Sequence, residues 1–300
     1  MCRVATEGGA DLVRYLQYKL LALDVDGTLM NSQKRISQAT RLALSQAMAQ
    51  GVHVTLATGR GFPSAVAIAR SLGLKTPLVT HDGGYVADPV TGRVVSRVAI
   101  PAETTAKAVE LFRECGLHVA LLHEKFRVID DRLPYWRKDW FKPGRWGEIY
   151  NFLWEYRNYP LVHAPNLAEY VRSNQLEVPK YYVTGDATSI KLGQTRLQQE
   201  MGDLLRTASA GPEAMEVMPV GLSKGTGVEA LAKSLGLTMQ EVIACGDNYN
   251  DVEMIRAAGM GVAMGQAPDE VRWSARFVTR SNDEDGVAYV VKRFLLDEAA

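Results

Sequence analysis

Short apolar segments alternate with amphipathic helical segments at both ends of this chain. The apolar runs are typical of strands that are covered on both faces in a parallel sheet, and the segments between them have the period of helices. Strand-like runs lie at 19–25, 52–58, 77–80, 242–247, 260–264 and 276–279, and helical patterns lie at 37–51, from Pro63, and at 223–236, 251–259 and 286–296. The sequence therefore predicts a doubly wound, mainly parallel α/β sheet.

The first helical segment begins after the N-cap residue Ser37 and stops at Gly51. Alanine and leucine recur along it at helical spacing, which predicts one face packed on the sheet. That face is expected to consist of Ala39, Leu42, Ala43 and Ala47.

The two strand–helix series are separated by a long segment with a different pattern. We predict a core formed by residues 19–84 and 217–300, an inserted α+β cap at 85–216, and a polar N-terminal extension at 1–18. Within the insertion, helical patterns at 102–116 and 189–201 alternate with strand-like runs at 118–129 and 180–185. Such a cap would exclude water from a reaction site and select the leaving group.

Acidic and hydroxyl side chains lie at the ends of several of the predicted core strands. Asp24 and Asp26 lie at the end of the first, Thr58 at the end of the second, and Asp247 and Asp251 at the end of a later one. The carboxyl ends of parallel strands meet at one edge of a sheet, so these groups are expected to lie together. Neighbouring carboxylates repel unless a cation is present, and oxygen ligands favour Mg²⁺. The sequence therefore predicts a magnesium site.

The first two aspartates and a distant lysine predict phosphoryl transfer at this edge. Lys224, just inside a predicted helix start, adds a cation beside helix N–H groups and would suit a phosphoryl oxygen. Asp24 would attack phosphorus, and Asp26 would protonate the leaving oxygen and later activate water. Gly27 would let the chain approach the ligand without a Cβ in the way.

The motifs DVDGT (24–28), LATGR (56–60), SKG (223–225) and GDNYND (246–251) resemble, in order and context, the four motifs of the haloacid dehalogenase (HAD) superfamily. The insertion resembles the type IIB cap of its Cof-like sugar-phosphate phosphatase branch. This resemblance implies a HAD/Rossmann-like core and Mg²⁺-dependent hydrolysis of a small phosphorylated metabolite. The presence of Asp26 also argues against the dehalogenase branch, which lacks this second aspartate.

The resemblance also assigns roles to single residues. It implies that Asp24 forms an aspartyl-phosphate, and that Asp26, the general acid and base, also offers its main-chain carbonyl to Mg²⁺. The residues it implies for phosphate binding are Thr58, Gly59, Arg60 and Lys224. Asp247 is implied as a metal ligand, and Asn250 and Asp251 are implied to support the metal ligands or to orient the lysine. One departure is Asp82, which stands where many relatives carry the asparagine of an Asn-Gly-Ala turn.

Charge and cysteine content restrict the partners and the compartment. Thirty-four basic and thirty-four acidic side chains cancel, so no global field favours nucleic acid or anionic lipid. The three cysteines are far apart and lack metal-ligand spacing, which favours a reducing cytoplasm. No apolar run is long enough for a membrane span. The sequence leaves the oligomeric state open.

Aromatic side chains concentrate at 135–160, where ten of the 24 in the chain occur, including four of its five tryptophans. Packing of the cap core or a subunit contact is the first interpretation of this segment. A substrate-facing wall is the second, and it predicts that changes at Trp136 or Trp140 alter substrate preference more than metal affinity. Balanced charge argues against nucleic-acid binding.

Three functions fit these residues. The leading hypothesis is a phosphatase. A phosphomutase of the phosphomannomutase type is an alternative, because the sequence does not reveal whether sugar or water accepts the phosphoryl group. A catalytically silent module that binds phosphate or metal is another, although loss of the nucleophile would be the usual sign of decay.

Overall fold

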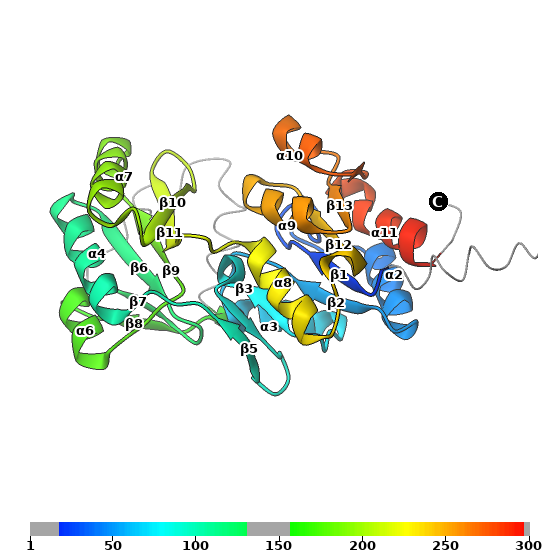
Figure 1. Cartoon of the computed structure of the whole chain (residues 1–300), viewed down its shortest axis with the longest axis horizontal. Coiled ribbons are helices and arrows are strands. Elements are labelled where there is room, and N and C mark those ends of the chain that lie inside the picture. The colour runs from blue at the N-terminus through cyan, green and yellow to red at the C-terminus, as the bar shows by residue number, and fades with distance from the viewer. Residues whose placement is uncertain (1–17, 131–156, 297–300) are drawn as a thin grey trace, which may run out of the picture.

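The computed structural model describes residues 18–130 and 157–296. Both ends of the chain build one α/β unit, and the middle of the chain builds a second unit beside it (Figure 1). In Figure 1 the second unit lies on the left, and the blue and orange-red elements of the first lie together on the right. The predicted fold, a mainly parallel sheet with an inserted α+β cap, is confirmed.

The core sheet has the strand order β14-β13-β12-β1-β2, with every pair parallel. Its strands are β1 (Leu20–Leu23), β2 (His53–Leu56), β12 (Val242–Gly246), β13 (Met260–Ala263) and β14 (Phe277–Val278). The central strand β1 joins distant parts of the chain, since Leu20 lies opposite both His53 and Val242. Beyond β2, a parallel bridge between Ala57 and Val79 adds β3 (Leu78–Thr80) to this edge.

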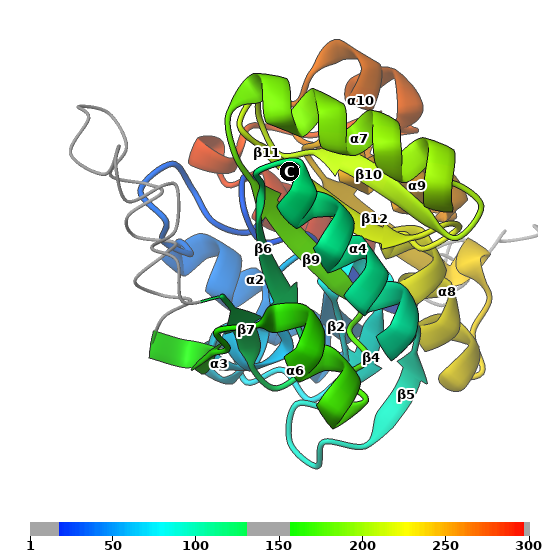
Figure 2. The same cartoon turned by 90° about the vertical axis from the view of Figure 1, so that its left-hand side faces the viewer.

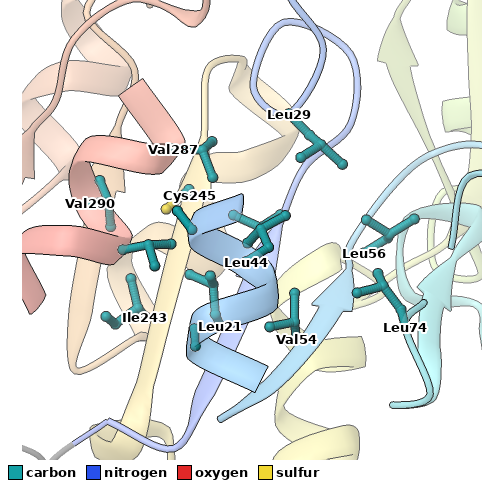
Figure 3. Close-up of a cluster of buried hydrophobic side chains, with 14 of the residues drawn as sticks. Leu21, Leu29, Leu44, Val54, Leu56, Leu74, Ile243, Cys245, Val287 and Val290 are labelled. Atoms are coloured by element: carbon teal, nitrogen blue, oxygen red, sulfur yellow. The ribbon is translucent and has the colours of Figure 1, made fainter. Parts of the chain in front are cut away.

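Helices cover both faces of the core sheet. They are α2 (Gln38–Ala49), α3 (Phe62–Leu72), α8 (Lys224–Ser234), α9 (Val252–Ala257), α10 (Asp269–Ser274) and α11 (Gly286–Val291). Because side chains alternate along a strand, Leu21 of β1 packs with α2 and α11 while Leu20 packs with α8 and α9. Figure 3 shows the first cluster, in which Leu44 and Val290 of the helices join side chains of β1, β2 and β12.

The buried face of α2 differs from the predicted one. Thr40, Ala43, Leu44 and Ala47 are buried, whereas Leu42 is 58% exposed and Ala39 is also exposed. Residues 40, 43, 44 and 47 repeat at the i, i+3, i+4, i+7 spacing of one helix face. The prediction chose Leu42 over Leu44, and that was wrong because the alanine-rich helix gives a weak pattern.

The cap is a mixed sheet with helices on one face (Figure 2). Its strand order is β10-β11-β9-β6-β7-β8. The strands are β6 (His118–Leu122), β7 (Arg127–Ile129), β8 (Leu161–His163), β9 (Lys180–Thr184), β10 (Leu205–Ser209) and β11 (Ala214–Pro219), and the helices are α4 (Ala102–Glu114), α6 (Leu167–Asn174) and α7 (Ala187–Met201). The run predicted as one strand at 118–129 is a hairpin, because the chain turns between His123 and Phe126.

The domain boundaries stay predictions. Just beyond the predicted boundary at 84/85, β4 (Tyr85–Ala87) pairs in antiparallel fashion with β3, and β5 (Val94–Arg97) pairs in the same fashion with β4. Residues 1–17 of the expected extension lie outside the described residues, as does most of the aromatic segment 135–160, with Trp136 and Trp140. No helix within the described parts of the chain has the length and apolar character needed to cross a bilayer.

Candidate active site

The chain turns sharply after β1 and brings Asp24 to the carboxyl edge of the core sheet. Asp24 is 5% exposed, and its main-chain oxygen accepts from the N–H of Leu29 at 3.2 Å. Gly27 has φ +89°, and a Cβ there would lie 2.3 Å from Oδ2 of Asp247. Glycine is therefore needed both for the left-handed turn and for the close approach of Asp247.

Lys224 meets Asp24 from the other end of the chain. It is the first residue of α8, whose N-cap Ser223 accepts a hydrogen bond from the N–H of Thr226. The Nζ of Lys224 lies 2.7 Å from Oδ1 of Asp24 and 2.7 Å from Oδ1 of Asp251. The lysine is 1% exposed, so a buried cation joins two buried carboxylates.

Asp247 completes the acidic cluster. Carboxylate oxygens of Asp24, Asp247 and Asp251 lie within 4.8 Å of one another. Oδ2 of Asp251 accepts from the N–H groups of Asp247 and Asn248 at 2.9 and 3.0 Å, so this side chain supports the loop as well as Lys224. The donor set is hard oxygen, which fits a divalent cation such as Mg²⁺.

Titration in the cluster reflects its crowded charge. Burial raises the pKa of Asp24 well above its ordinary value, and Asp251 and Asp247 add to the rise while Lys224 opposes it. Burial likewise raises the pKa of Asp247 to about 6. An ion bound between these carboxylates would favour their charged forms, so the electrostatics of the residues present also fit a cation.

Asp26 is not one of the three clustered carboxylates, and it is held by Arg60. Nε of Arg60 lies 2.7 Å from Oδ2 of Asp26, its Nη2 lies 2.9 Å from Oδ1, and Nζ of Lys34 lies 3.3 Å from Oδ1. Burial opposes ionisation, but Arg60 and Lys34 lower the pKa of Asp26. In this arrangement Asp26 is an ion-paired carboxylate, and its predicted role as general acid would require Arg60 to leave it first.

Thr58 lies just beyond β2, the strand that pairs with β1. The N–H of Ala57 donates to the main-chain oxygen of Leu23 at 2.8 Å, which fixes the register of the two loops. Thr58 is 2% exposed, and its Oγ1 accepts from the N–H of Arg60 at 3.2 Å. The loop 58–60 thus forms a turn at the rim of the site.

Asp82 links this loop to the fourth motif and to the cap. It has left-handed backbone angles (φ 52°, ψ 37°) and is 2% exposed. Nδ2 of Asn250 donates to its Oδ1 at 3.0 Å, and Nζ of Lys180, from cap strand β9, lies 2.5 Å from its Oδ2. Burial opposes ionisation, but Lys180 brings the pKa of Asp82 to about 2. The departure from asparagine is thus matched by a buried cation.

Comparison with known proteins agrees with the motifs. The sequence profile of the haloacid dehalogenase-like hydrolases matches residues 21–291. This chain belongs to that family. Among its HAD relatives, the stress response protein YhaX of Bacillus subtilis is 33% identical over 278 residues, which cover 92% of this chain and 93% of YhaX.

Two further HAD relatives carry phosphatase names. The 5-amino-6-(5-phospho-D-ribitylamino)uracil phosphatase YcsE of Bacillus subtilis is 28% identical, over 93% of this chain and 96% of YcsE. The solved structure of a HAD subclass IIB sugar phosphatase superposes with a TM-score of 0.73 at 25% identity, and covers 92% of this chain and 98% of its own. The predicted resemblance to the HAD superfamily and its type IIB branch is confirmed.

Sequence reasoning missed several contacts of this HAD site. Oγ1 of Thr28 donates to Oδ1 of Asp247 at 2.8 Å, and its place in the first motif was the available signal. The cap residues Lys180 and Tyr159 gave no comparable signal, because a lysine at a strand start and a tyrosine in an aromatic run are ordinary features. Both reach the turn at 81–82 that follows β3.

His81, in this turn, is expected to lower the folding stability of this protein at acidic pH. It is fully buried, and its Nε2 lies 3.1 Å from the hydroxyl of Tyr159. Burial lowers its pKa to about 3, helped by Lys180 and His123 and opposed by Glu124 and Asp82. Below about pH 6.5 the imidazole of His81 binds a proton in the unfolded chain but stays neutral in the folded chain. The free energy of unfolding therefore falls by up to about 1.4 kcal/mol per pH unit.

Urea unfolding at about pH 7 and about pH 5 would measure this effect. A His81→Asn variant should show a flatter pH dependence than the wild type, because asparagine tolerates left-handed angles and does not titrate. The exposed His53 provides the control, and His53→Asn should leave the slope unchanged. Equal slopes for the wild type and His81→Asn would contradict the prediction.

Proposed function

We propose that this HAD hydrolase is a Mg²⁺-dependent phosphatase of small phosphorylated metabolites that works through an aspartyl-phosphate on Asp24. The observation that carries the proposal is the contact of Lys224 with Asp24 inside the acidic cluster. A buried carboxylate beside a fixed cation and a place for a divalent ion suits nucleophilic attack on phosphorus.

The first half-reaction forms a bond between a carboxylate oxygen of Asp24 and phosphorus, while the bond from phosphorus to the ester oxygen breaks. Asp26 gives its proton to that leaving oxygen. In the second half-reaction Asp26 takes a proton from water, the water oxygen attacks phosphorus, and the carboxylate of Asp24 is released with inorganic phosphate.

The other predicted site residues would bind and orient. Lys224, the hydroxyl of Thr58 and the N–H of Gly59 are proposed to bind phosphoryl oxygens, while Asn250 and Asp251 would orient the loops around them. A Mg²⁺ ion held by Asp24, the main-chain carbonyl of Asp26 and Asp247 would supply electrostatic stabilisation of the phosphoryl charge.

Arg60 is proposed to bind the phosphoryl group as well. It is now paired with Asp26. An incoming phosphate monoester offers the guanidinium a second anionic partner with matching geometry. Transfer of Arg60 from Asp26 to the phosphoryl group would leave Asp26 able to take up the proton that it must donate.

The relatives' names support the proposed substrate class. A sugar phosphatase and a phosphatase of a phosphorylated ribityl compound both act on small phosphorylated metabolites. We propose the same class here, in a reducing cytoplasm suited to widely spaced cysteines.

Phosphate release from sugar, polyol and nucleotide monophosphates, with Mg²⁺ and with EDTA, tests the proposal. We expect turnover of at least one ester with Mg²⁺ and its loss in EDTA, because the acidic cluster then lacks its ion. Undiminished turnover in EDTA would refute the magnesium requirement. Product isomerisation without free phosphate would indicate a phosphomutase, and inertness toward every ester would indicate a silent binding module.

A further inference from the structure

Lys180 is a buried cation that takes no part in the proposed reaction. It begins cap strand β9 and is 1% exposed. Its neighbour Tyr181 packs among the cap helices, so Lys180 points from the opposite face of the cap sheet, toward the core. A charge in this position needs partners, because burying it unpaired is costly.

Its partners come from both units. Nζ of Lys180 lies 2.5 Å from Oδ2 of Asp82 and 3.4 Å from the main-chain oxygen of Gly59, both in the core. It also lies 2.7 Å from Oε1 of Glu216, on cap strand β11. Among the described residues, these acceptors match the three N–H donors of an ammonium group. Lys180 is therefore placed to join the units rather than to bind substrate.

The core partners of Lys180 belong to the loops that hold the reaction site. Gly59 lies between Thr58 and Arg60, and a Cβ at Gly59 would be 3.2 Å from the Nζ of Lys180. The N–H of Asp82 donates to the main-chain oxygen of Thr58 at 3.1 Å, and its side chain accepts from Asn250. Lys180 of the cap thus contacts the loop 58–60 directly, and it reaches Asn250 of the fourth motif through Asp82.

Charge balance makes these contacts depend on the position of the cap. With the cap docked, the ammonium of Lys180 neutralises the buried carboxylate of Asp82 and the partly buried carboxylate of Glu216. Without that cation, docking would bury Asp82 close to the like charge of Glu216, which strongly opposes the docked state.

We propose that Lys180 is a positioning residue that couples docking of the cap to the order of the loop 58–60 and the turn 81–82. The proposal rests on the phosphatase function proposed above. It predicts that loss of Lys180 lowers the rate of the chemical step although no reacting atom is touched, because the loops are then held less firmly.

The first measurement compares Lys180→Met with Lys191→Met, a matched change at an exposed lysine on cap helix α7. Steady-state kinetics on a sugar monophosphate should show kcat lowered at least tenfold in Lys180→Met, with a smaller change in KM. The Mg²⁺ concentration for half-maximal activity should stay within twofold, since Lys180 does not contact the acidic cluster. Lys191→Met should behave as the wild type.

A double variant separates positioning from folding stability. Lys180→Met with Asp82→Asn removes one uncompensated carboxylate, so urea unfolding should show stability regained relative to Lys180→Met. The proposal expects kcat to stay low, because the bridge between the units is still missing. Wild-type kcat in either Lys180→Met or the double variant would overturn it.

Hydrogen exchange gives a readout that does not need turnover. Amides of residues 58–60 and 81–84 should exchange at least tenfold faster in Lys180→Met than in Lys191→Met, while amides of β12 exchange alike. A wild type inert toward all esters would refute the phosphatase proposal alone, and this comparison would still decide the role of Lys180. Unchanged exchange at both loops would refute the coupling.

Discussion

An Asp24→Asn variant is expected to release phosphate slower than the wild type by on the order of 10³-fold or more. The amide that replaces the carboxylate is a poor nucleophile and offers one oxygen where the aspartate offers two, so neither the covalent step nor metal binding is preserved. Colorimetric phosphate assays at saturating Mg²⁺, with the ester that the wild type turns over fastest, would measure the loss.

The Asp24→Asn variant should also remain folded, which makes the activity loss interpretable. Lys224 keeps its contact with Asp251 at 2.7 Å, and burial already disfavours the charged form of Asp24. Thermal melting should therefore stay close to that of the wild type. Asp203→Asn, at an exposed cap position, controls for the substitution itself. An Asp24→Asn variant with wild-type turnover would rule out this nucleophile.

A Lys224→Met variant is expected to lose both activity and stability. Removal of the cation leaves Asp24 and Asp251 buried and facing each other, with no compensating charge at 2.7 Å from either. Breaking a buried ion pair in this way costs about 3–5 kcal/mol. Phosphate release should fall by about 10²-fold or more, because a fixed cation beside the transferring group is also lost.

Urea unfolding near neutral pH, together with the phosphate assay, would test Lys224→Met. Lys233→Met is the matched control, since Lys233 lies exposed in the last turn of the same helix α8. It should change the free energy of unfolding by less than about 0.5 kcal/mol. A Lys224→Met variant as stable as Lys233→Met would mean that the contact of Lys224 with Asp24 and Asp251 contributes little to the fold.

The features predictable from the sequence are those with a local pattern. The strands around Asp24 and Asp247 could be found because apolar runs that end in aspartate are visible within a few residues. The pairing of Lys180 with Asp82 could not, because 98 positions separate them and neither residue is unusual in its own segment. The orientation of Asp26 toward Arg60 was likewise hidden, since it depends on the turn after β1 and not on the motif.

The place of β1 between β2 and β12 has a consequence for the order in which the protein folds during synthesis. Strand β1 emerges early from the ribosome, yet its partner Val242 and the carboxylates of Asp247 and Asp251 emerge much later. The intervening cap is contiguous and has its own apolar cluster, so it is able to collapse first, as domains fold in turn during translation. We expect the nascent chain to carry a folded cap on an incomplete core. The active site can assemble only after residue 251 has left the ribosome.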